Sequence, residues 1–213
     1  MPKMRPRRLP ADARRHEIVE WAFRLLAEKG FEGLRMRDIA LHVGINSATI
    51  HHYFATKQDL IEGVAHHLAV MFSTQRAPAL KFDAAASPPI RELRQEFADA
   101  AFYRAKHPDF LLVSRELTLR AQRDPDVAAV IAPLNSQWCE AIEGILARGQ
   151  REQVFRRDIV PASMSRVIVG ALWGMGALLQ LSTREFADAC GAIERSLLVL
   201  TRPAKTATRS RSR

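Results

Sequence analysis

The feature that most constrains this chain is the spacing of its apolar residues, which follows the α-helical period between glycines and prolines. Met36, Ile39, Ala40 and Val43 recur at positions i, i+3, i+4 and i+7, and Gly44 follows them. This spacing puts apolar side chains on one face of a helix, and a glycine commonly ends such a helix. Similar patterns recur along the chain, while almost no segment alternates as a half-buried strand does. The sequence therefore predicts an all-α protein of about nine helices.

Four helices are expected before a connection rich in alanine and proline at residues 77–89. The first spans residues 12–29 and is ended by Gly30, and a short helix from Met36 is closed by Gly44. A second short helix is capped by Asn46 and ends near Phe54. The fourth runs from about Thr56 to Phe72. The connection is the expected boundary between an N-terminal domain, residues 12–72, and a second helical domain, residues 73–202.

Prolines mark the starts of the later helices, because proline is tolerated in the first turn and disfavoured further in. The expected helices run from Ser87-Pro88-Pro89 to about Lys106, from His107-Pro108, from Asp124-Pro125 to Gly149, from about Pro161 to Leu181, and from Ser182, which has capping-box spacing to Glu185. The helix around Gly170 and Trp173 is apolar nearly all round, which indicates burial on more than one side.

The net charge of +9 is concentrated at the two ends of the chain. Residues 1–60 carry 11 Lys and Arg against 7 Asp and Glu, and residues 202–213 carry five basic residues and no acidic one. The ends are therefore the candidates for contact with nucleic acid, although basic surfaces also serve solubility alone. We interpret residues 1–11 as a basic flexible arm, which either tracks a minor groove or solubilises the chain, and residues 203–213 as a disordered basic tail.

Two short helices separated by a tight turn at Gly44 predict a helix-turn-helix, residues 35–54. In such a motif the second helix enters the major groove of DNA. Ile50 and Phe54 lie four residues apart and define the buried side of this second helix. At about 100° per residue, the outward-facing side chains are then Ala48 and His52, flanked by Thr49, His51 and Tyr53.

These outward residue types suit DNA better than they suit a protein core. Ala48 permits close approach of the backbone and offers a methyl group to a thymine methyl. The Thr49 hydroxyl and the two imidazoles are hydrogen-bonding groups for base edges or phosphates. Lys57 opens the next helix, where its charge and the exposed N–H groups suit a phosphate. Arg35 and Arg37, at the start of the preceding helix, are further candidates for contact with the DNA backbone.

A solvated polar face is the other explanation for His51 and His52, because short helices joined by a glycine turn are common. Neither this pair nor His66 and His67 has the spacing of a metal site. Adjacent imidazoles on a helix point in different directions, and no carboxylate or cysteine completes a ligand set. We therefore expect no metal, and we interpret His66 and His67 as surface residues.

The segment from Gly30 to Lys57 closely resembles the DNA-binding domain of tetracycline-repressor-like (TetR family) regulators. The resemblance covers about residues 12–72 and is carried by Gly30-Phe31, Arg37-Asp38-Ile39-Ala40, Val43-Gly44-Ile45, Ala48-Thr49-Ile50-His51-His52-Tyr53-Phe54 and Lys57. It implies a homodimer whose two recognition helices read a palindromic operator. It also implies a pocket for a small-molecule effector in the C-terminal domain and a dimer interface built from the last two long helices.

Two positions depart from the pattern of the family. Leu34 and Arg35 stand where Thr or Ser often begins the first helix of the motif, and Ser47 stands where a basic residue is frequent. The positions that the resemblance and the helix geometry together nominate for DNA contact are Arg35, Arg37, Ser47, Ala48, Thr49, His51, His52, Tyr53 and Lys57.

The second domain offers aromatic residues for an apolar pocket but no distinctive signature. The candidate wall residues are Phe102, Tyr103, Phe110, Trp138 and Trp173, with His107, Arg115 or Gln180 as polar anchors. Ordinary core packing explains each of them as well, so the sequence assigns no ligand-binding residue.

The sequence thus predicts a cytoplasmic, ligand-responsive DNA-binding regulator, expected to be a homodimeric repressor released from its operator by a small molecule. No signal-peptide pattern follows the basic N-terminus, and the apolar run at residues 167–181 is shorter than the roughly 18–20 residues that span a bilayer. No phosphate loop or nucleophile elbow indicates an enzyme, so no catalytic residue and no cofactor are expected. The alternatives are an activator with the same DNA-binding mode, and a helical scaffold or ligand-binding protein with a vestigial motif.

Overall fold

The computed structural model describes residues 10–177 and 181–198, and every statement about structure refers to these residues. They form nine helices: α1 (Ala11–Gly33), α2 (Met36–Val43), α3 (Ser47–Tyr53), α4 (Lys57–Thr74), α5 (Pro88–Lys106), α6 (Pro108–Ala121), α7 (Pro125–Arg151), α8 (Pro161–Ala177) and α9 (Thr183–Leu197). The prediction of an all-α fold with about nine helices is confirmed. Residues 1–9 of the predicted arm, the predicted tail 203–213 and Gln180 lie outside the described residues.

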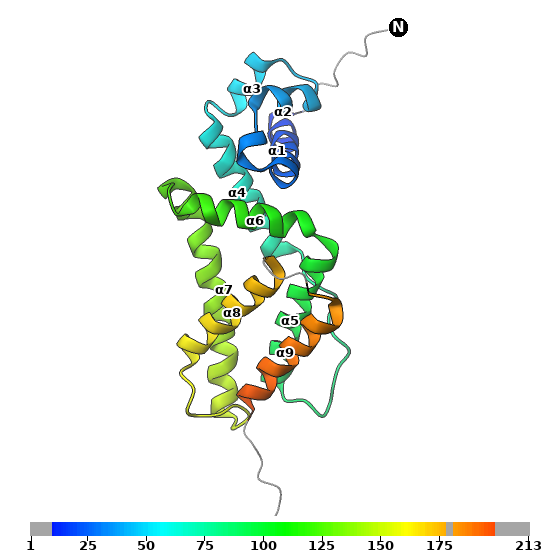
Figure 1. Cartoon of the computed structure of the whole chain (residues 1–213), viewed down its shortest axis with the longest axis vertical. Coiled ribbons are helices and arrows are strands. Elements are labelled where there is room, and N and C mark those ends of the chain that lie inside the picture. Colours follow the sequence, from blue (N-terminus) through cyan, green and yellow to red (C-terminus); the bar gives the residue numbers. More distant parts are fainter. Residues whose placement is uncertain (1–9, 178–180, 199–213) are drawn as a thin grey trace, which may run out of the picture.

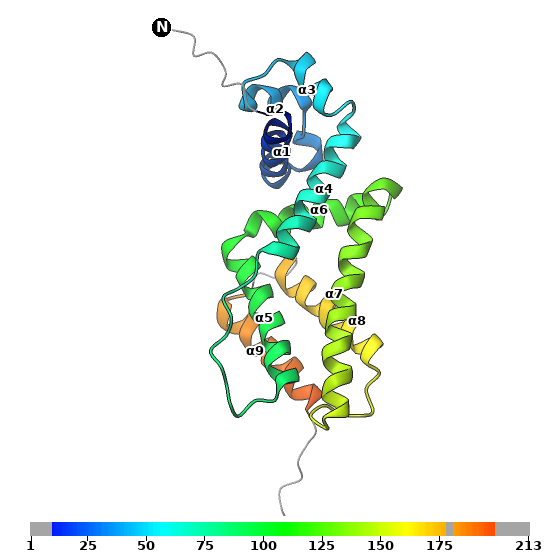
Figure 2. The ribbon, with the colours of Figure 1, turned by 180° about the vertical axis from the view of Figure 1, so that it is seen from behind.

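The helices are arranged along an elongated body with two ends (Figure 1). Helices α1, α2 and α3 gather at one end, and α5, α7, α8 and α9 form the other. Helix α4 leads from the first end towards the second, and α6 crosses between them, as the reverse view also shows (Figure 2). Because α1 contacts both α4 and α6, two helices join the first end to the rest of the molecule.

The expected helix starts are confirmed. Helices α5, α6 and α7 each begin with proline. The Asp124 carboxylate accepts hydrogen bonds from the backbone N–H groups of Asp126 at 3.2 Å and Val127 at 3.4 Å, which caps α7. At α9, the Ser182 hydroxyl accepts from the Glu185 N–H at 3.2 Å, and the Glu185 carboxylate accepts from the Ser182 N–H at 2.7 Å. The predicted capping box is therefore formed.

Two glycines differ from the roles that the sequence predicts for them. Gly30 adopts φ 62° and ψ −171°, which interrupts α1 as expected, but one more helical turn follows up to Gly33. The prediction that Gly149 ends its helix is wrong, because α7 continues to Arg151. A Cβ atom at position 149 would lie 2.0 Å from the Phe155 ring. This glycine therefore serves the close approach of an aromatic ring to the helix backbone.

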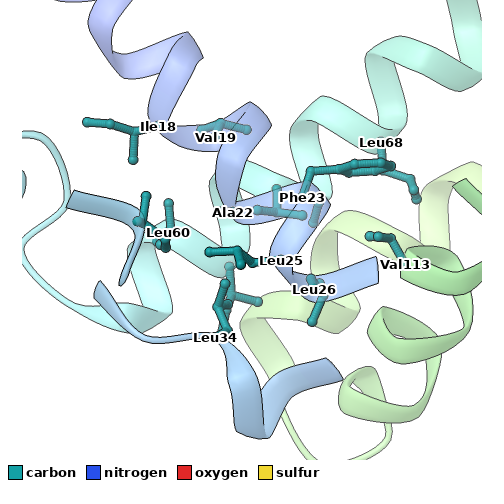
Figure 3. Close-up of a cluster of buried hydrophobic side chains, with 14 of the residues drawn as sticks. Ile18, Val19, Ala22, Phe23, Leu25, Leu26, Leu34, Leu60, Leu68 and Val113 are labelled. Atoms are coloured by element: carbon teal, nitrogen blue, oxygen red, sulfur yellow. The ribbon is translucent and has the colours of Figure 1, made fainter. Parts of the chain in front are cut away.

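One hydrophobic core joins the first end of the molecule to α6 and to the start of α7. Ala22 and Leu26 of α1 and Val113 of α6 have no exposed surface in it, and Leu68 of α4 is almost fully buried (Figure 3). Val113 belongs to the second predicted domain, since it follows the connection at residues 77–89. The two predicted domains therefore share one core at their junction.

A second core lies at the other end of the molecule, among α5, α7, α8 and α9. Leu93 of α5, Ile142 and Leu146 of α7 and Leu197 of α9 have no solvent-exposed surface there. Within residues 10–177 and 181–198, no helix combines the length and the apolar character needed to cross a membrane.

Candidate nucleic-acid interface and ligand cavity

The turn between α2 and α3 depends on Gly44. This residue adopts φ 72° and ψ 31°, the left-handed conformation that glycine adopts without steric cost. Its N–H bonds to carbonyl oxygens in the last turn of α2, and the Ile45 N–H donates to the Ala40 carbonyl at 2.9 Å. These bonds fix the angle at which α3 leaves α2.

The orientation of α3 agrees with the sequence prediction. Ile50 has no exposed surface and Phe54 only 1%, so both anchor the helix in the first core. Of the predicted DNA-contact residues of this helix, four are exposed (Ser47, Ala48, His51 and His52) and two are half-buried (Thr49 and Tyr53). The predicted residues thus share the face of α3 that points away from the protein.

The Thr49 hydroxyl is already engaged within the protein. Asn46 caps α3 as predicted, because its side-chain oxygen accepts from the Thr49 N–H at 2.6 Å. The Thr49 hydroxyl donates to the same oxygen at 2.8 Å. Its proton is therefore used, and this hydroxyl presents acceptor lone pairs to an incoming ligand, such as a donor on a base edge.

The His51 ring lies against a backbone carbonyl just beyond α3. Its Nδ1 atom lies 3.1 Å from the Ala55 carbonyl oxygen. Because a carbonyl only accepts, Nδ1 carries the proton, and the exposed Nε2 atom of the neutral ring is an acceptor. His52, which is also exposed, has no such constraint among the described residues.

Lys57 opens α4 beside the end of α1. Its ammonium group donates to the Phe31 carbonyl at 2.9 Å and is exposed, so it presents positive charge next to α3. The start of α4 has a capping box, in which the Thr56 N–H donates to the Asp59 carboxylate at 2.9 Å and the Asp59 N–H to the Thr56 hydroxyl at 3.1 Å. Two of the N–H groups predicted to meet a phosphate are therefore already bonded, which leaves the Lys57 charge as the main attraction there.

Arg35 and Arg37 are exposed at the start of α2. Arg35 is the N-cap residue and makes no side-chain cap bond, in keeping with the missing Thr or Ser at this point. The Arg37 guanidinium lies 3.9 Å from the Asp38 carboxylate, an exposed contact that contributes little free energy. Both guanidinium groups remain accessible to a phosphate backbone.

Two arginines of α1 support this interface and were missed by the sequence analysis. Arg15 donates to the Tyr53 carbonyl at 2.6 Å, and its guanidinium carbon lies 4.2 Å from the centre of the Phe54 ring. Arg14 is buried and donates to the Val43 carbonyl at 3.1 Å. The two side chains therefore hold the last residues of α3 and α2 on α1. No local pattern signals this, because the partners are remote in sequence.

His67 is not the surface residue that the sequence predicted, although the adjacent His66 is exposed. The ring of His67 lies 5.4 Å from that of His16 and 5.4 Å from that of Phe23. Burial lowers the pKa of His67, the nearby His16 lowers it further, and Glu20 raises it in part. His67 is thus held in its neutral form at the contact between α1 and α4.

A narrow cavity lies where α4, α5, α6, α7 and α8 meet. It holds about 50 Å³ of space that a water molecule can enter, within an empty volume of about 550 Å³ that includes open solvent. Most of its wall is apolar or aromatic, and the lining residues are Phe72, Gln75, Arg76, Glu96, Asp99, Ala100, Tyr103, Phe110, Leu111, Trp138, Leu172, Trp173 and Gly176. A smaller hollow, with about 20 Å³ of such space, adjoins it, since Phe72, Phe110, Trp138 and Trp173 line both.

The polar side of the cavity is a cluster of charged residues from the end of α4 and from α5. Arg76 lies 2.9 Å from the Asp99 carboxylate and 3.3 Å from that of Glu96. Glu96 also accepts from the Trp138 indole N–H at 2.8 Å. The hydrogen bond to Asp99 is the main reason that the pKa of Arg76 is raised. Burial raises the pKa of Tyr103 to about 12, so its hydroxyl stays protonated at the cavity wall.

The sequence identified four of the aromatic wall residues but not the polar ones. Tyr103, Phe110, Trp138 and Trp173 line the cavity, whereas Phe102 and His107 do not. The rings of Phe102 and His107 instead contact each other, with their centres 5.2 Å apart. Arg115 lines a separate surface hollow, and Gln180 lies outside the described residues. Arg76, Glu96 and Asp99 meet only in the folded chain, which is why sequence spacing did not reveal them.

Comparison with protein-family models identifies both halves of the chain. The model described as "Bacterial regulatory proteins, tetR family" matches residues 18–64, which contain α2, α3 and the turn between them. The model described as "Tetracyclin repressor-like, C-terminal domain" matches residues 89–176, which contain most of the helices that form the cavity. Together the two matches cover more than half of the chain.

Individual relatives have low identity but extensive coverage. The HTH-type transcriptional repressor NicS of Pseudomonas putida is 27% identical over 149 residues, which are 70% of this chain and 69% of NicS. A putative transcriptional regulator from Saccharomonospora viridis in complex with choline has a TM-score of 0.72 at 21% identity and covers 90% of this chain and 100% of its own. AibR in complex with isovaleryl coenzyme A and operator DNA has a TM-score of 0.67 at 19% identity, with coverage of 86% and 98%. The structural likenesses show that the fold is shared.

Proposed function

The chain belongs to the tetR family of bacterial regulatory proteins, and we propose that it acts as a homodimeric repressor that a small molecule releases from a palindromic operator. As a member of this family it is a DNA-binding transcriptional regulator and not an enzyme. The proposed place of action is the cytoplasm, because operator DNA is found there. The solved structure of AibR, with both an acyl-coenzyme A and operator DNA, supports this mode of action by analogy.

The observation that carries the proposal is the exposed face of α3. Its polar residues point away from a helix that Ile50 and Phe54 bury firmly, while Lys57 presents a positive charge at one end. The His51 ring lies against the Ala55 carbonyl, and the Arg15 bond to the Tyr53 carbonyl holds the end of α3 on α1, so this face is presented in a defined orientation. We infer that Ser47, Ala48, His51 and His52 contact the base edges and that Arg35, Arg37 and Lys57 contact phosphates, with Thr49 and Tyr53 at the border.

Helix α4 connects the cavity to the DNA-reading end. Its first residue, Lys57, bonds to α1, and Gln58 donates to the Asp124 carboxylate at the start of α7 at 3.0 Å. At its other end, the Tyr103 hydroxyl lies 2.8 Å from the Met71 carbonyl oxygen and 2.6 Å from that of Gln75. A ligand that moves Tyr103 would therefore move the end of α4, and with it the DNA-reading end.

In the proposed dimer, this movement changes the separation of the two recognition helices. Binding to two half-sites needs a separation of about 34–36 Å, one turn of DNA. To shift the protein from mostly bound to mostly free, the ligand must favour the released form by several kcal/mol. A change in the ratio of released to bound protein from 1:99 to 99:1 needs about 5.5 kcal/mol.

The proposed dimer interface is formed by α8 and α9. Val167 of α8 is 62% exposed in the single chain, and a Cβ atom at Gly170 or Gly174 would meet no atom of the described chain within 4 Å. We expect Val167→Glu to convert the dimer to monomers in sedimentation velocity, because it would bury a charge in the interface. Leu41→Glu, at the exposed Leu41 of α2, is the matched control and should leave the dimer intact.

Fluorescence anisotropy with labelled DNA from upstream of the protein's own gene tests the proposed function. We expect tighter binding to this duplex than to a scrambled one. Lys57→Ala should weaken binding several-fold and lower the salt slope by about one, because one phosphate contact is lost. Lys106→Ala removes the same charge from the exposed end of α5 and should change neither quantity. Thr49→Ala should weaken binding to the specific duplex more than to the scrambled one.

Equal, steeply salt-dependent binding to both duplexes would leave only attraction by charge at this fragment. The purified protein would then be used to select from sheared genomic DNA. If no fragment were enriched, a helical ligand-binding protein with a vestigial motif would replace the proposed regulator. Transcription in vitro from the bound promoter distinguishes repression from activation. If the protein is a repressor, adding it lowers the amount of transcript.

A further inference from the structure

We propose that the cavity binds an apolar organic cation, that is, an amine carried on an aromatic or aliphatic body. This inference rests on the proposed ligand-responsive function and names the chemical class of its ligand. Three features of the cavity carry it: the balance of charge in the wall, the number of aromatic rings, and a buried acceptor without a donor.

The wall has more negative than positive charge. Its charged side chains are Glu96, Asp99 and Arg76, which together leave one net negative charge when all are ionised. The two carboxylates are the more buried groups, since the side chain of Glu96 is 14% exposed and that of Asp99 is 9%, against 55% for Arg76. Within the cavity the negative charge is therefore less screened by water than the positive charge, which favours a cationic ligand.

Arg76 is not available as an anchor for an anionic ligand. It is bonded to both carboxylates, and Asp99 is held in place by two further donors, the Ala77 N–H at 2.9 Å and the Gln95 amide at 3.0 Å. A ligand carboxylate would have to displace Arg76 from these partners and would then face two buried acidic groups. Both displacing Arg76 and placing a second anion beside buried carboxylates cost free energy, and a cationic ligand avoids both costs.

Five aromatic rings form much of the remaining wall, namely those of Phe72, Tyr103, Phe110, Trp138 and Trp173. The faces of such rings attract cations, and desolvated contacts of this kind contribute up to about 2 kcal/mol. The same rings bury the apolar body of a ligand. The indole of Trp138 donates to Glu96, so the edge of an aromatic ring and a carboxylate lie next to each other on one side of the cavity.

Gln75 supplies an acceptor that lacks a donor. Gln75 lines the cavity, and its side-chain oxygen is buried and has no hydrogen-bond partner among the described residues. A buried polar atom of this kind costs free energy until a donor reaches it. An ammonium group has N–H donors and no acceptor, so it can satisfy Gln75 and a carboxylate together. A ligand carboxylate has only acceptors and leaves Gln75 unsatisfied.

The test is the binding of three compounds that share one body: 4-phenylbutylamine, 4-phenylbutan-1-ol and 4-phenylbutyrate. Quenching of tryptophan fluorescence, with Trp138 and Trp173 in the cavity wall, and calorimetry report binding to the full-length protein. We expect the amine to bind at least about tenfold more tightly than the carboxylate, with the neutral alcohol between them.

Glu96→Gln removes one negative charge while it keeps an acceptor for Trp138. We expect this variant to weaken binding of the amine about three- to tenfold and to leave that of the alcohol nearly unchanged. Glu92→Gln is the matched control, because Glu92 lies one turn earlier on α5, pairs with Arg148 and does not line the cavity. Glu92→Gln should alter binding of none of the three compounds. Unchanged thermal unfolding confirms that each variant is folded.

Three results would overturn the proposal: carboxylate binding as tight as amine binding, no measurable binding of the amine at millimolar concentration, or an amine-to-alcohol ratio that Glu96→Gln does not change. Each compound is also added to the protein–DNA complex. A carboxylate that binds and releases DNA would contradict the cation proposal but support ligand-released regulation. An amine that binds without changing DNA affinity would support the cation site and contradict its regulatory role.

Discussion

The DNA-reading end of the molecule is closely packed, whereas the region around the cavity is not. At the end formed by α1, α2 and α3, fully buried residues such as Ile18, Ala22 and Leu26 fill the core (Figure 3). Between this end and the second core, where α4 to α8 meet, aromatic side chains surround a narrow cavity with about 50 Å³ of space that water can enter. All three buried side-chain atoms that lack a hydrogen-bond partner in the described residues, those of Gln75, Ser87 and Ser114, also lie outside α1–α4.

This difference corresponds to the two tasks of the protein. A surface that reads DNA must keep its side chains in fixed positions, and a close-packed core with satisfied polar groups does so. A site that responds to a ligand needs space and polar groups whose partners change on binding. The shared core around Val113 of α6 joins the fixed end to the adaptable one.

The largest expected effect comes from removing a leucine side chain in the filled core and comparing it with removal of one in the cavity wall. We expect Leu26→Ala, in the filled core, to lower the free energy of unfolding by about 2–5 kcal/mol, because it leaves a void. Leu111 lines the cavity and is half-buried, so Leu111→Ala should cost clearly less. Urea unfolding monitored by circular dichroism measures both. Equal losses would contradict the proposed difference in packing.

A second pair of substitutions adds one methyl group at each end. A Cβ atom at Gly63 would lie 3.0 Å from the Phe54 ring and 3.2 Å from Val19, so we expect Gly63→Ala to destabilise the protein by about 1–3 kcal/mol. At Gly144 of α7 the nearest atom is the flexible end of Arg148, at 3.4 Å. There, Gly144→Ala should stabilise by up to about 1 kcal/mol, because alanine favours the helix. A stabilising Gly63→Ala would show that the first core has spare space.

The third prediction concerns how α1 holds α3. Arg15→Ala removes a bond to the Tyr53 carbonyl and the contact with the Phe54 ring. We expect an about fivefold loss of operator affinity, which corresponds to roughly 1 kcal/mol, with little change in stability. Arg24→Ala is the control, because Arg24 lies over Trp21 on the same helix, 5.0 Å from the ring centre. Anisotropy that finds equal losses for both variants would assign the effect to net charge alone.

The smallest expected effect is on pH dependence. The pKa of His67 is lowered in the folded protein, so below about pH 6.5 the unfolded chain takes up a proton before the folded one does. Unfolding free energy should therefore fall as pH decreases from 6.5 towards the lowered pKa. His67→Gln should make this fall less steep between pH 7 and 5 in urea titrations. His66→Gln changes an exposed neighbour and should have no such effect; a steepened fall for His67→Gln would contradict the assigned direction.

The sequence predicted local features well and long-range clusters poorly. The spacing of Ile50 and Phe54 was enough to orient α3, because helix geometry fixes which residues share a face. The tight turn at Gly44 was also predicted from local sequence, because a glycine commonly ends a helix. By contrast, the meeting of Arg76 with Glu96 and Asp99 depends on how α4 and α5 pack, and the partners of Arg15 are set by tertiary contacts.

Native-state hydrogen exchange tests the difference between the two ends most directly. We predict that amides around Ala22 and Leu26 of α1 exchange only through global unfolding, with a strong dependence on denaturant. Amides around Glu96 and Tyr103 of α5, beside the cavity, should exchange through local opening that denaturant hardly affects. The opposite result would be exchange through local opening at the α1 amides and through global unfolding at the α5 amides. It would show that the fixed and adaptable regions are reversed.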